Sequence, residues 1–360
     1  MDLTLGRRLR ELPGPVLITG HTGFKGTWLT LLMERLEVSV IGLSLPATPH
    51  SLYERAERLG AIPEEFLDIR DFELVSSFMS KYKPSAIIHM AAQPLVLESY
   101  ESPRLTFETN VMGTVNVLDA AFATDSVEGF IVVTTDKVYR NDNSGKKFVE
   151  SDALAGKDPY SASKVGTESA VAAWQQISRV TNGPKVVSVR AGNVIGGGDW
   201  AENRLLPDLV RGFSTDTVIK VRNAKSTRPW QHVVDPLVGY VMALESALSG
   251  DAVTAVNFGP SSDSISVREV VEISKGVWPR PVSVEFSDQS EEGLEAVALQ
   301  LNSELAMSTF NWSCAWNQRE SVEATIKWWD KVLNKSVNPV LACAADIDVA
   351  LEKSRSLGIS

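Results

Sequence analysis

Four residues in the middle of the chain carry side chains that can act as acids and bases. Asp136 and Lys137 follow a short apolar run, and Tyr160 and Lys164 lie four positions apart further on. Residues four apart share one face of a helix, so Tyr160 and Lys164 can work as a pair. A cation beside a phenol favours the phenolate, which makes Tyr160 a candidate general base. Asp136 and Lys137 would add a second acid and base.

The segment before this cluster has the pattern of a buried strand. The apolar run Ile131–Val133 ends in Thr134 and Thr135, which is typical of a parallel strand whose carboxyl end leads into a site. Ligands of doubly wound sheets bind at that edge. We therefore expect one catalytic cluster, made of Thr135, Asp136, Lys137, Tyr160 and Lys164.

A glycine-rich segment near the N-terminus predicts a dinucleotide-binding loop. A short apolar strand over 15–19 leads into Gly20, Gly23 and Gly26, and a helix over about 27–36 follows. The first glycine permits a tight turn, the second lets the backbone approach a pyrophosphate, and the third lets the helix pack on the strand. The pyrophosphate would bind N–H groups at the helix N-terminus.

The second expected strand, over 38–43, indicates which dinucleotide is bound. It ends without the acidic residue that grips the adenosine ribose of NAD, and Ser44 stands there instead. No arginine follows directly to hold a 2′-phosphate, so we expect NAD and leave NADP open. The expected cofactor contacts are Gly20, Thr22, Gly23, Phe24, Lys25, Gly26, Ser44, Asp68, Ile69, Ala91, Ala92, Gln93, Asn110, Thr134, Tyr160 and Lys164.

Strands and helices are expected to alternate along the first half of the chain. A third strand and its exit turn are predicted over 66–71, where Asp71 could instead cap the helix that follows. Further strands are predicted over 85–89 and 185–190, with helices over 103–123 and 160–180. This alternation indicates a parallel sheet with right-handed crossovers. The predicted fold class is α/β, a doubly wound parallel Rossmann sheet with a smaller C-terminal α/β substrate lobe. The expected divisions are a dinucleotide-binding domain over 1–190, a substrate lobe over 191–335 from which part of the chain returns to the sheet, and a tail over 336–360.

The region after residue 190 predicts a diphosphate site. The segment 191–200 is too rich in glycine for a regular element and reads as a ligand loop, and Arg204, Arg222 and Arg228 follow it in an acidic protein. Guanidinium groups bind phosphate bidentately, which favours a diphosphate ligand, while surface salt bridges are the alternative. The candidate substrate contacts are Gln93, Asn193, Arg204, Leu205, Arg222, Arg228, Gln231 and Asn257.

Composition narrows the class of protein and its location. The chain has 360 residues and a net charge of −10 at pH 7, which argues against a nucleic-acid partner. No apolar run approaches the roughly 18 residues of a membrane span, and no signal peptide is recognisable. Two cysteines provide no disulfide framework, so a reducing cytoplasm is expected. We expect no metal site.

Several stretches carry a resemblance to a known family. The chain resembles the extended short-chain dehydrogenase/reductases, in particular the nucleotide-sugar epimerases and dehydratases, and among those the branch of CDP-glucose 4,6-dehydratases. The tyrosine–lysine pair marks only the superfamily, whereas Gly-Asn-Val-Ile-Gly-Gly-Gly-Asp-Trp over 192–200 and Arg-Pro-Trp-Gln-His over 228–232 are narrower signals. The chain departs from the family at Leu97, where an arginine is usual, so the nucleotide base stays open.

The resemblance implies a hydro-lyase that uses NAD and turns a nucleotide sugar, CDP-glucose foremost, into its 4-keto-6-deoxy form. Tyr160 would take the proton of the C4 hydroxyl, which Thr135 orients, while hydride passes to NAD. Lys137 would remove the C5 proton, and Asp136 would protonate the departing C6 hydroxyl. The resemblance also implies a homodimer that pairs two helices from each chain.

Two alternative functions stay open. A nucleotide-sugar 4-epimerase or 4-reductase on this fold needs only a threonine, a tyrosine and a lysine, so Asp136 and Lys137 favour elimination. A non-catalytic dinucleotide-sensing protein would keep the glycine loop and lose the tyrosine, so Tyr160 argues against it. As alternatives without a catalytic role, Asp136 could cap a turn and Lys137 could be a solvated loop lysine.

Overall fold

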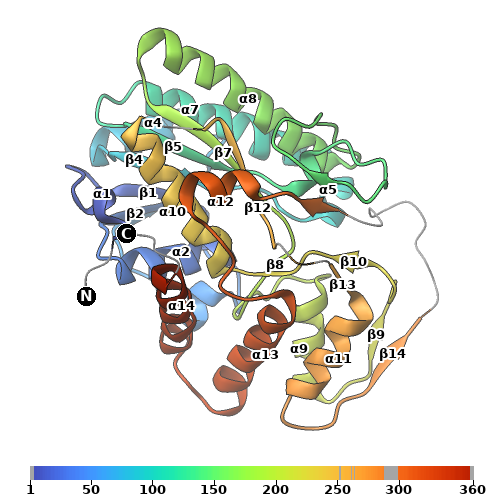
Figure 1. Cartoon of the computed structure of the whole chain (residues 1–360). Helices are drawn as coiled ribbons and strands as arrows, with labels where there is room; N and C mark the ends of the chain where they lie inside the picture. The colour runs from blue at the N-terminus through green and yellow to red at the C-terminus, as the bar shows by residue number, and fades with distance from the viewer. Residues whose placement is uncertain (1–3, 251–252, 261, 263, 288–298, 357–360) are drawn as a thin grey trace.

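The centre of the molecule is one parallel sheet (Figure 1). The computed structural model describes residues 4–250, 253–260, 262, 264–287 and 299–356. Seven strands lie in the order β12-β7-β5-β4-β1-β2-β3, and every neighbouring pair is parallel. They are β1 (Val16–Thr19), β2 (Val40–Ser44), β3 (Glu64–Phe66), β4 (Ala86–His89), β5 (Gly129–Val133), β7 (Lys185–Ala191) and β12 (Ala255–Phe258). This order confirms the predicted doubly wound α/β sheet.

Helices cover both faces of the sheet. On one face, α4 (Phe72–Tyr82), α7 (Gly113–Phe122) and α8 (Pro159–Thr181) share an apolar layer with Leu17. On the other, α2 (Phe24–Arg35), α10 (Val234–Ser249) and α14 (Pro339–Ser356) pack with Val16 and Ile18. Successive residues of a strand point to opposite faces, so a strand covered on both sides must be apolar throughout. This is why the apolar runs in the sequence predicted the central strands.

The remaining elements form the lobe and the connections. The lobe contains α9 (Leu205–Thr215), α11 (Val267–Val277) and α13 (Gln318–Asn334). Its short strands pair as β9 (Ile219–Val221) with β14 (Val284–Phe286), β10 (Thr227–Arg228) with β13 (Ile265–Ser266), and β8 (Val194–Ile195) with β11 (Gln231–His232). A further pair joins β6 (Lys147–Phe148) to β15 (Gln300–Leu301). The smaller helices are α1 (Arg7–Arg10), α3 (Leu52–Arg55), α5 (Val96–Glu101), α6 (Pro103–Phe107) and α12 (Glu304–Phe310). Between α9 and α11 the chain returns to the sheet as α10 and β12.

Two expected elements differ from the structure. The third strand covers Glu64–Phe66, so it ends at the first residue of the segment 66–71 that was predicted as a strand and its exit turn, and Asp71 caps α4 by accepting a hydrogen bond from the N–H of Leu74. The helix expected over 103–123 contains a π-helical turn, η1 (Glu108–Met112), between α6 and α7. Such turns widen a helix locally and often lie at functional sites. Here the turn carries Asn110, which reaches the loop after β4.

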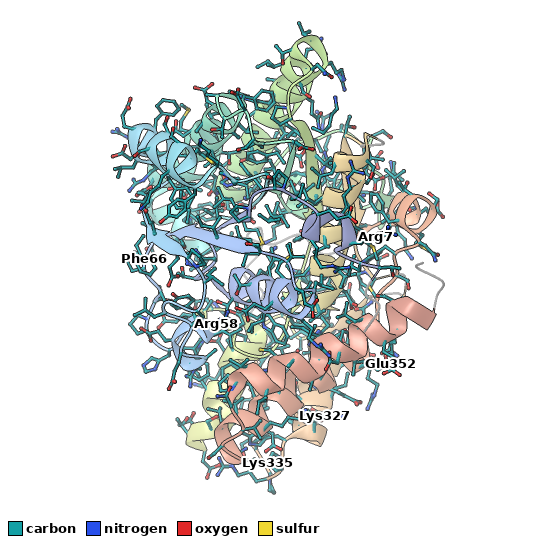
Figure 2. The ribbon with its side chains drawn as sticks, turned by 90° about the vertical axis from the view of Figure 1, so that its left-hand side faces the viewer. Arg7, Arg58, Phe66, Lys327, Lys335 and Glu352 are labelled. Atoms are coloured by element: carbon teal, nitrogen blue, oxygen red, sulfur yellow. The ribbon has the colours of Figure 1, made fainter. Side chains whose placement is uncertain are left out.

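The C-terminal helix α14 closes one side of the molecule. It lies against α2 and α13, and Arg35 on α2 places its Nε 2.7 Å from the carboxylate of Asp348. Figure 2 looks onto this side and shows Glu352 on α14 and Phe66 at the edge of the sheet. Within the described residues, no helix combines the length and the apolar character that crossing a bilayer requires.

Candidate active site

Thr135 and Asp136 stand together where β5 ends. Thr135 begins a short 3-10 helix, η2 (Asp136–Val138), and its hydroxyl accepts a hydrogen bond from the N–H of Lys137 at 3.3 Å. The same hydroxyl donates to the Asp136 carboxylate at 3.0 Å. Both residues are buried, and Lys137 is half-buried beside them. The parallel sheet therefore delivers the predicted polar cluster at its carboxyl edge.

The carboxyl group of Asp136 is poised to hold a proton. It is 2% exposed, and this burial raises its pKa, while the positive charges of Lys137 and Arg228 and the hydrogen bond from Thr135 oppose the rise. A raised pKa favours the neutral acid, which can donate a proton. Asp136 is not the cap of this turn, because Thr135 is the residue that caps η2.

Tyr160 and Lys164 lie on the first two turns of α8. Asp158 forms a capping box with Ser161 at the start of this helix, and the N–H of Tyr160 donates to the Ser99 hydroxyl at 3.1 Å. The phenol of Tyr160 is hydrogen-bonded to Thr135, which joins the helix to the strand end. The Lys164 ammonium donates to the carbonyl of Val133 at 3.2 Å. The two halves of the expected cluster thus meet.

Burial shifts the pKa of both members of this pair. Burial raises the pKa of Tyr160 to about 12, although the hydrogen bond to Thr135 and the charge of Arg204 lower it. Burial lowers the pKa of Lys164 to about 8. Desolvation penalises both charged forms, so the lysine alone does not stabilise the phenolate. A further positive charge beside the phenol would favour the phenolate.

The glycine loop has the geometry that a dinucleotide needs. Gly20 adopts a left-handed φ of 74°, and a Cβ there would lie 2.8 Å from the backbone nitrogen of Ala91. At Gly26 a Cβ would lie 2.1 Å from the carbonyl oxygen of Gly20, so only glycine lets α2 pack this closely. No described side chain caps α2 at Gly23, which leaves its first N–H groups facing the loop. A pyrophosphate fits this arrangement.

Lys25 links the glycine loop to the catalytic cluster. Its ammonium lies 3.5 Å from the Tyr240 hydroxyl. Burial lowers the pKa of Lys25 to about 7, the cations Lys164 and Arg204 lower it further, and Asp136 opposes them. These mutual effects place Lys25 and Arg204 in the electrostatic surroundings of the catalytic residues.

The expected adenosine end of the cofactor site is assembled in part by side chains. The hydroxyls of Thr22 and Ser44 lie 2.8 Å apart. Asp68 forms a salt bridge with Arg70, with 2.6 Å between Oδ2 and Nη2. Ile69 is 3% exposed and packs onto Gly113, so only its main chain is available to a ligand.

The loop after β4 is held by Asn110. Its side-chain oxygen accepts from the N–H of Gln93 at 2.8 Å, and its amide nitrogen donates to the Gln93 carbonyl at 3.0 Å and to Ser163 at 2.9 Å. The Gln93 amide turns back to Leu95 and Thr106. Asn110 therefore positions the segment Met90–Gln93, which includes the predicted contacts Ala91 and Ala92, and ties it to α8.

Of the predicted substrate residues, two arginines lie near the cluster. Arg204 directly precedes α9, which begins at Leu205, and pairs with Asp199 at 3.0 Å between Nη1 and Oδ2. Arg228 acts on Asp136 through its charge. Arg222 follows β9 on the exposed surface of the lobe. The diphosphate reading of Arg204 and Arg228 stays a prediction.

Two other predicted substrate residues are buried in the support of the site. The Gln231 amide nitrogen donates to the carbonyls of Gly192 and Phe258 at 3.1 and 2.9 Å, and its N–H donates to the carbonyl of Asn193 at 3.2 Å. Asn257 is fully buried, and its amide donates to the carbonyls of Phe148 and Asn302 while accepting from Tyr139. Asn257 is better described as a supporting residue than as a substrate contact, because the protein uses both of its amide protons and its oxygen.

The glycines of the loop 191–200 are packing residues. A Cβ at Gly197 would lie 1.9 Å from the ring of Trp328, and one at Gly198 would lie 2.6 Å from Leu52. At Gly196 a Cβ would meet Phe24 at 3.2 Å and Val233 at 2.7 Å. Three glycines of this run therefore admit apolar side chains from distant segments, and the interpretation of the segment as a ligand loop stays a prediction.

Sequence reasoning missed the residues that support the catalytic pair. Glu168 lies one turn beyond Lys164 on α8 and binds Arg190 on β7, with 2.8 Å between Oε2 and Nη2. Both side chains are 5% exposed. The spacing Tyr160, Lys164, Glu168 repeats every four residues and was the available signal, because it places all three on one helix face.

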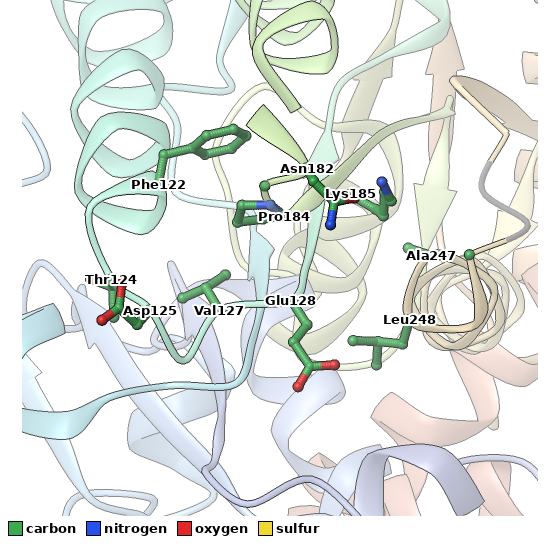
Figure 3. A pocket seen from close by; sticks show the side chains of 12 residues that line it. Phe122, Thr124, Asp125, Val127, Glu128, Asn182, Pro184, Lys185, Ala247 and Leu248 are labelled. Carbon is green, nitrogen blue, oxygen red and sulfur yellow. The ribbon is translucent and has the colours of Figure 1, made fainter. Parts of the chain in front are cut away.

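A surface pocket lies at the opposite edge of the sheet (Figure 3). Its lining includes Glu128, which precedes β5, and Lys185, which begins β7. Thr135 lies beyond the other end of β5, and Ala191 is the other end of β7. Among the described residues that line this pocket, none is a predicted site residue. It is separate from the catalytic cluster.

The sequence of this chain is similar to those of known proteins. Residues 16–259 match the model of the NAD dependent epimerase/dehydratase family. The CDP-glucose 4,6-dehydratase of Salmonella typhimurium is 38% identical over 323 residues, covering 87% of this chain and 89% of that protein. A UDP-glucose 4-epimerase of Rhizobium meliloti is 26% identical over 279 residues, covering 72% and 82% of the two chains.

Solved structures share the fold. A dTDP-glucose 4,6-dehydratase from Streptomyces venezuelae, with NAD and TYD bound, superposes with a TM-score of 0.75 at 22% identity. The superposition covers 91% of this chain and 99% of that one. At this identity the likeness carries the fold alone.

Proposed function

This chain belongs to the NAD dependent epimerase/dehydratase family, and we propose that it is a nucleotide-sugar 4,6-dehydratase that converts CDP-glucose to CDP-4-keto-6-deoxyglucose. The observation that carries the proposal is the position of Asp136 and Lys137 beside Thr135 and Tyr160. Hydride transfer at C4 needs the threonine and tyrosine, whereas loss of water needs a further acid and base.

The cofactor of this reaction is NAD, which the family model and the glycine loop both support. When bound, NAD supplies a hydride acceptor for C4 and a hydride donor for C6, so the reaction has no net oxidation. Tyr160, whose pKa burial raises, would be favoured as the phenolate by a cationic ring bound beside it. Gly20, Gly23 and Gly26 would hold its pyrophosphate.

The first step belongs to Tyr160. Its phenolate accepts the proton of the C4 hydroxyl as that carbon is oxidised to a ketone. Thr135, hydrogen-bonded to Tyr160, orients the hydroxyl. Lys164, anchored on the Val133 carbonyl, holds its charge beside the phenol.

The elimination belongs to Lys137 and Asp136. The C4 ketone acidifies the proton on C5, and Lys137 accepts that proton. Asp136, whose raised pKa favours the acid form, donates its proton to the C6 hydroxyl, which leaves as water. The double bond that forms between C5 and C6 accepts hydride at C6 and a proton at C5. The product is the 4-keto-6-deoxy sugar.

Substrate choice is part of the proposal. The relative from Salmonella typhimurium supports a cytidine diphosphate sugar. Arg204 and Arg228, which influence the pKa values of Tyr160 and Asp136, are the arginines that would hold the diphosphate. Both free cysteines, Cys314 and Cys343, suit the reducing cytoplasm that we propose as the location.

Assembly is proposed to be a homodimer. Large apolar side chains stand exposed along the segment from α5 to η1, including Leu105, Phe107 and Met112. The same segment packs beside α8. A second copy of these helices would cover the apolar face in a four-helix bundle. Light scattering that returns the mass of a monomer would refute this assembly.

The deciding experiment compares substrates. The purified protein with NAD is incubated separately with CDP-, dTDP-, GDP- and UDP-glucose, and the 4-keto-6-deoxy product is identified by mass spectrometry. CDP-glucose should be converted fastest. A 4-epimer formed from any of them would favour the epimerase alternative, and the absence of product from all four would revive the non-catalytic sensor.

A further inference from the structure

The catalytic face of α8 continues beyond the tyrosine and the lysine. Tyr160, Lys164 and Glu168 follow one another at intervals of four residues, so their side chains rise from one side of the helix. Glu168 is buried, with 6% of its surface exposed. It touches neither of the groups that exchange protons with the sugar in the proposed reaction.

The Glu168 carboxylate accepts four hydrogen bonds. One oxygen accepts from Thr134 at 2.6 Å and from the Nε of Arg190 at 2.8 Å. The other accepts from Ser188 at 2.9 Å and from the Nη2 of Arg190 at 2.8 Å. These donors come from the end of β5 and from β7, so one carboxylate joins the catalytic helix to two central strands.

Arg190, the partner of Glu168, donates two further hydrogen bonds. Its Nη1 donates to the Tyr139 hydroxyl at 2.8 Å and to the carbonyl of Glu150 at 3.0 Å. Tyr139 in turn donates to Asn257 at 2.7 Å. The network therefore runs from α8 to the residue that directly follows η2, the turn that carries Asp136 and Lys137.

The contacts of Lys164 and Glu168 fall on neighbouring residues of one strand end. Lys164 donates to the carbonyl of Val133, and Glu168 accepts from the side chain of Thr134. Glu168 is also the charge that opposes the lowering of the Lys164 pKa by burial. A buried carboxylate at this place favours the ammonium form of the lysine.

We propose that Glu168, locked by Arg190, is a positioning residue that sets both the placement of the Tyr160–Lys164 pair and the charge of Lys164. A buried ion pair is weak evidence for stability, because apolar side chains of the same volume often serve a fold as well. The four hydrogen bonds that the Glu168 carboxylate accepts connect α8 with Thr134 after β5 and with β7. They therefore make the Glu168–Arg190 pair part of the catalytic site. This inference rests on the proposed function for its kinetic part only.

The main test replaces the charge and keeps the shape. In Glu168→Gln, the pKa of Lys164 should fall by about one unit, because the opposite charge beside it is gone. Isotope-labelled lysine reports this directly through the chemical shift of its ε-carbon during a pH titration, and Lys164→Arg assigns the signal. An unchanged Lys164 pKa in folded Glu168→Gln overturns the charge part of the proposal.

Turnover supplies the second readout. The basic limb of the pH profile of kcat should move to lower pH in Glu168→Gln by the same amount, since Lys164 must stay protonated. Ser188→Ala removes one donor to the same carboxylate without changing its charge, so its pH limbs should match those of the unaltered protein. Equal shifts in both variants would point to a general structural disturbance and would overturn the proposal.

A shorter acid keeps the test valid if Glu168→Gln does not fold. Glu168→Asp retains the charge and cannot reach all four donors, so kcat should fall at least about tenfold with KM unchanged, without a shift of the basic limb. A kcat within about twofold of the unaltered protein would overturn the positioning role. If no nucleotide sugar is converted by the unaltered protein, the proposed function fails, while the lysine titration still decides the role of Glu168.

Discussion

The carboxyl group of Asp136 lies directly on the α-carbon of Gly192. A Cβ at that glycine would come within 1.8 Å of Oδ2 of Asp136. Gly192 follows the last residue of β7, and Asp136 begins the turn after β5, so the parallel pairing of these strands brings the two residues together. The absence of a side chain at residue 192 is therefore what lets the proposed general acid occupy its place.

We predict that Gly192→Ala displaces Asp136 and slows dehydration by about 100-fold, the contribution typical of a general acid. The measurement is the rate of product formation from CDP-glucose with NAD. Gly276→Ala is the matched control, since an added Cβ at Gly276 meets nothing within 4 Å. Equal rates in the two variants would contradict the contact as a determinant of activity.

Replacing the general base should stop the reaction before any chemistry. We expect Tyr160→Phe to lose turnover by at least about 1,000-fold, because the C4 proton has no acceptor. Neither product nor reduced NAD should form in a single turnover. Appearance of reduced NAD at the normal rate would remove Tyr160 from this role.

Lys137 can be tested by isotope exchange. We predict that Lys137→Ala still oxidises C4 but no longer exchanges the C5 proton with solvent. Reduced NAD should therefore accumulate in deuterium oxide without deuterium at C5. Normal incorporation of deuterium at C5, measured by mass spectrometry, would show that another group is the base.

Asp136→Asn separates the acid from the base. The amide keeps the size of the side chain but has no acidic proton to transfer to the C6 hydroxyl, so elimination should slow by about 100-fold while C4 oxidation persists. The burst of reduced NAD in a single turnover measures the first step, and release of product measures the second. Product formation at an unchanged rate would exclude Asp136 from the mechanism.

The buried carboxyl of Asp235 predicts a pH dependence of stability. Burial raises its pKa to about 7, while the N–H of Ala315 donates to it at 2.6 Å. A folded-state pKa above the unfolded one means that the folded chain binds more protons, so this group stabilises the fold at low pH. That contribution, on the order of 4 kcal/mol, should be lost as the pH rises from about 4 to about 7.

Chemical denaturation across this pH range tests the contribution. Asp235→Asn should flatten the fall in unfolding free energy between those pH values. Asp125→Asn, at an exposed carboxyl, should leave the slope in place. A slope that survives in Asp235→Asn would assign the pH dependence to other groups.

The sequence alone determined the parts of this protein that depend on local pattern. The apolar runs predicted the central strands because both faces of the sheet are covered, and the order of helices and strands predicted their parallel pairing. The spacing of Gly20, Gly23 and Gly26 predicted a loop in which a Cβ at the first or third would collide with backbone. The four-residue spacing of Tyr160 and Lys164 predicted their common face.

Only the tertiary structure decided what surrounds those residues. The contact of Asp136 with Gly192, the ion pair of Glu168 with Arg190 and the burial of Asn257 join segments that are far apart in the chain. The glycines near residue 197 admit Trp328 and other apolar side chains, a packing role that the sequence pattern did not indicate. Periodicity reports which face a residue is on, but burial, and with it the pKa of Asp136 and Tyr160, depends on which distant segments close over that face.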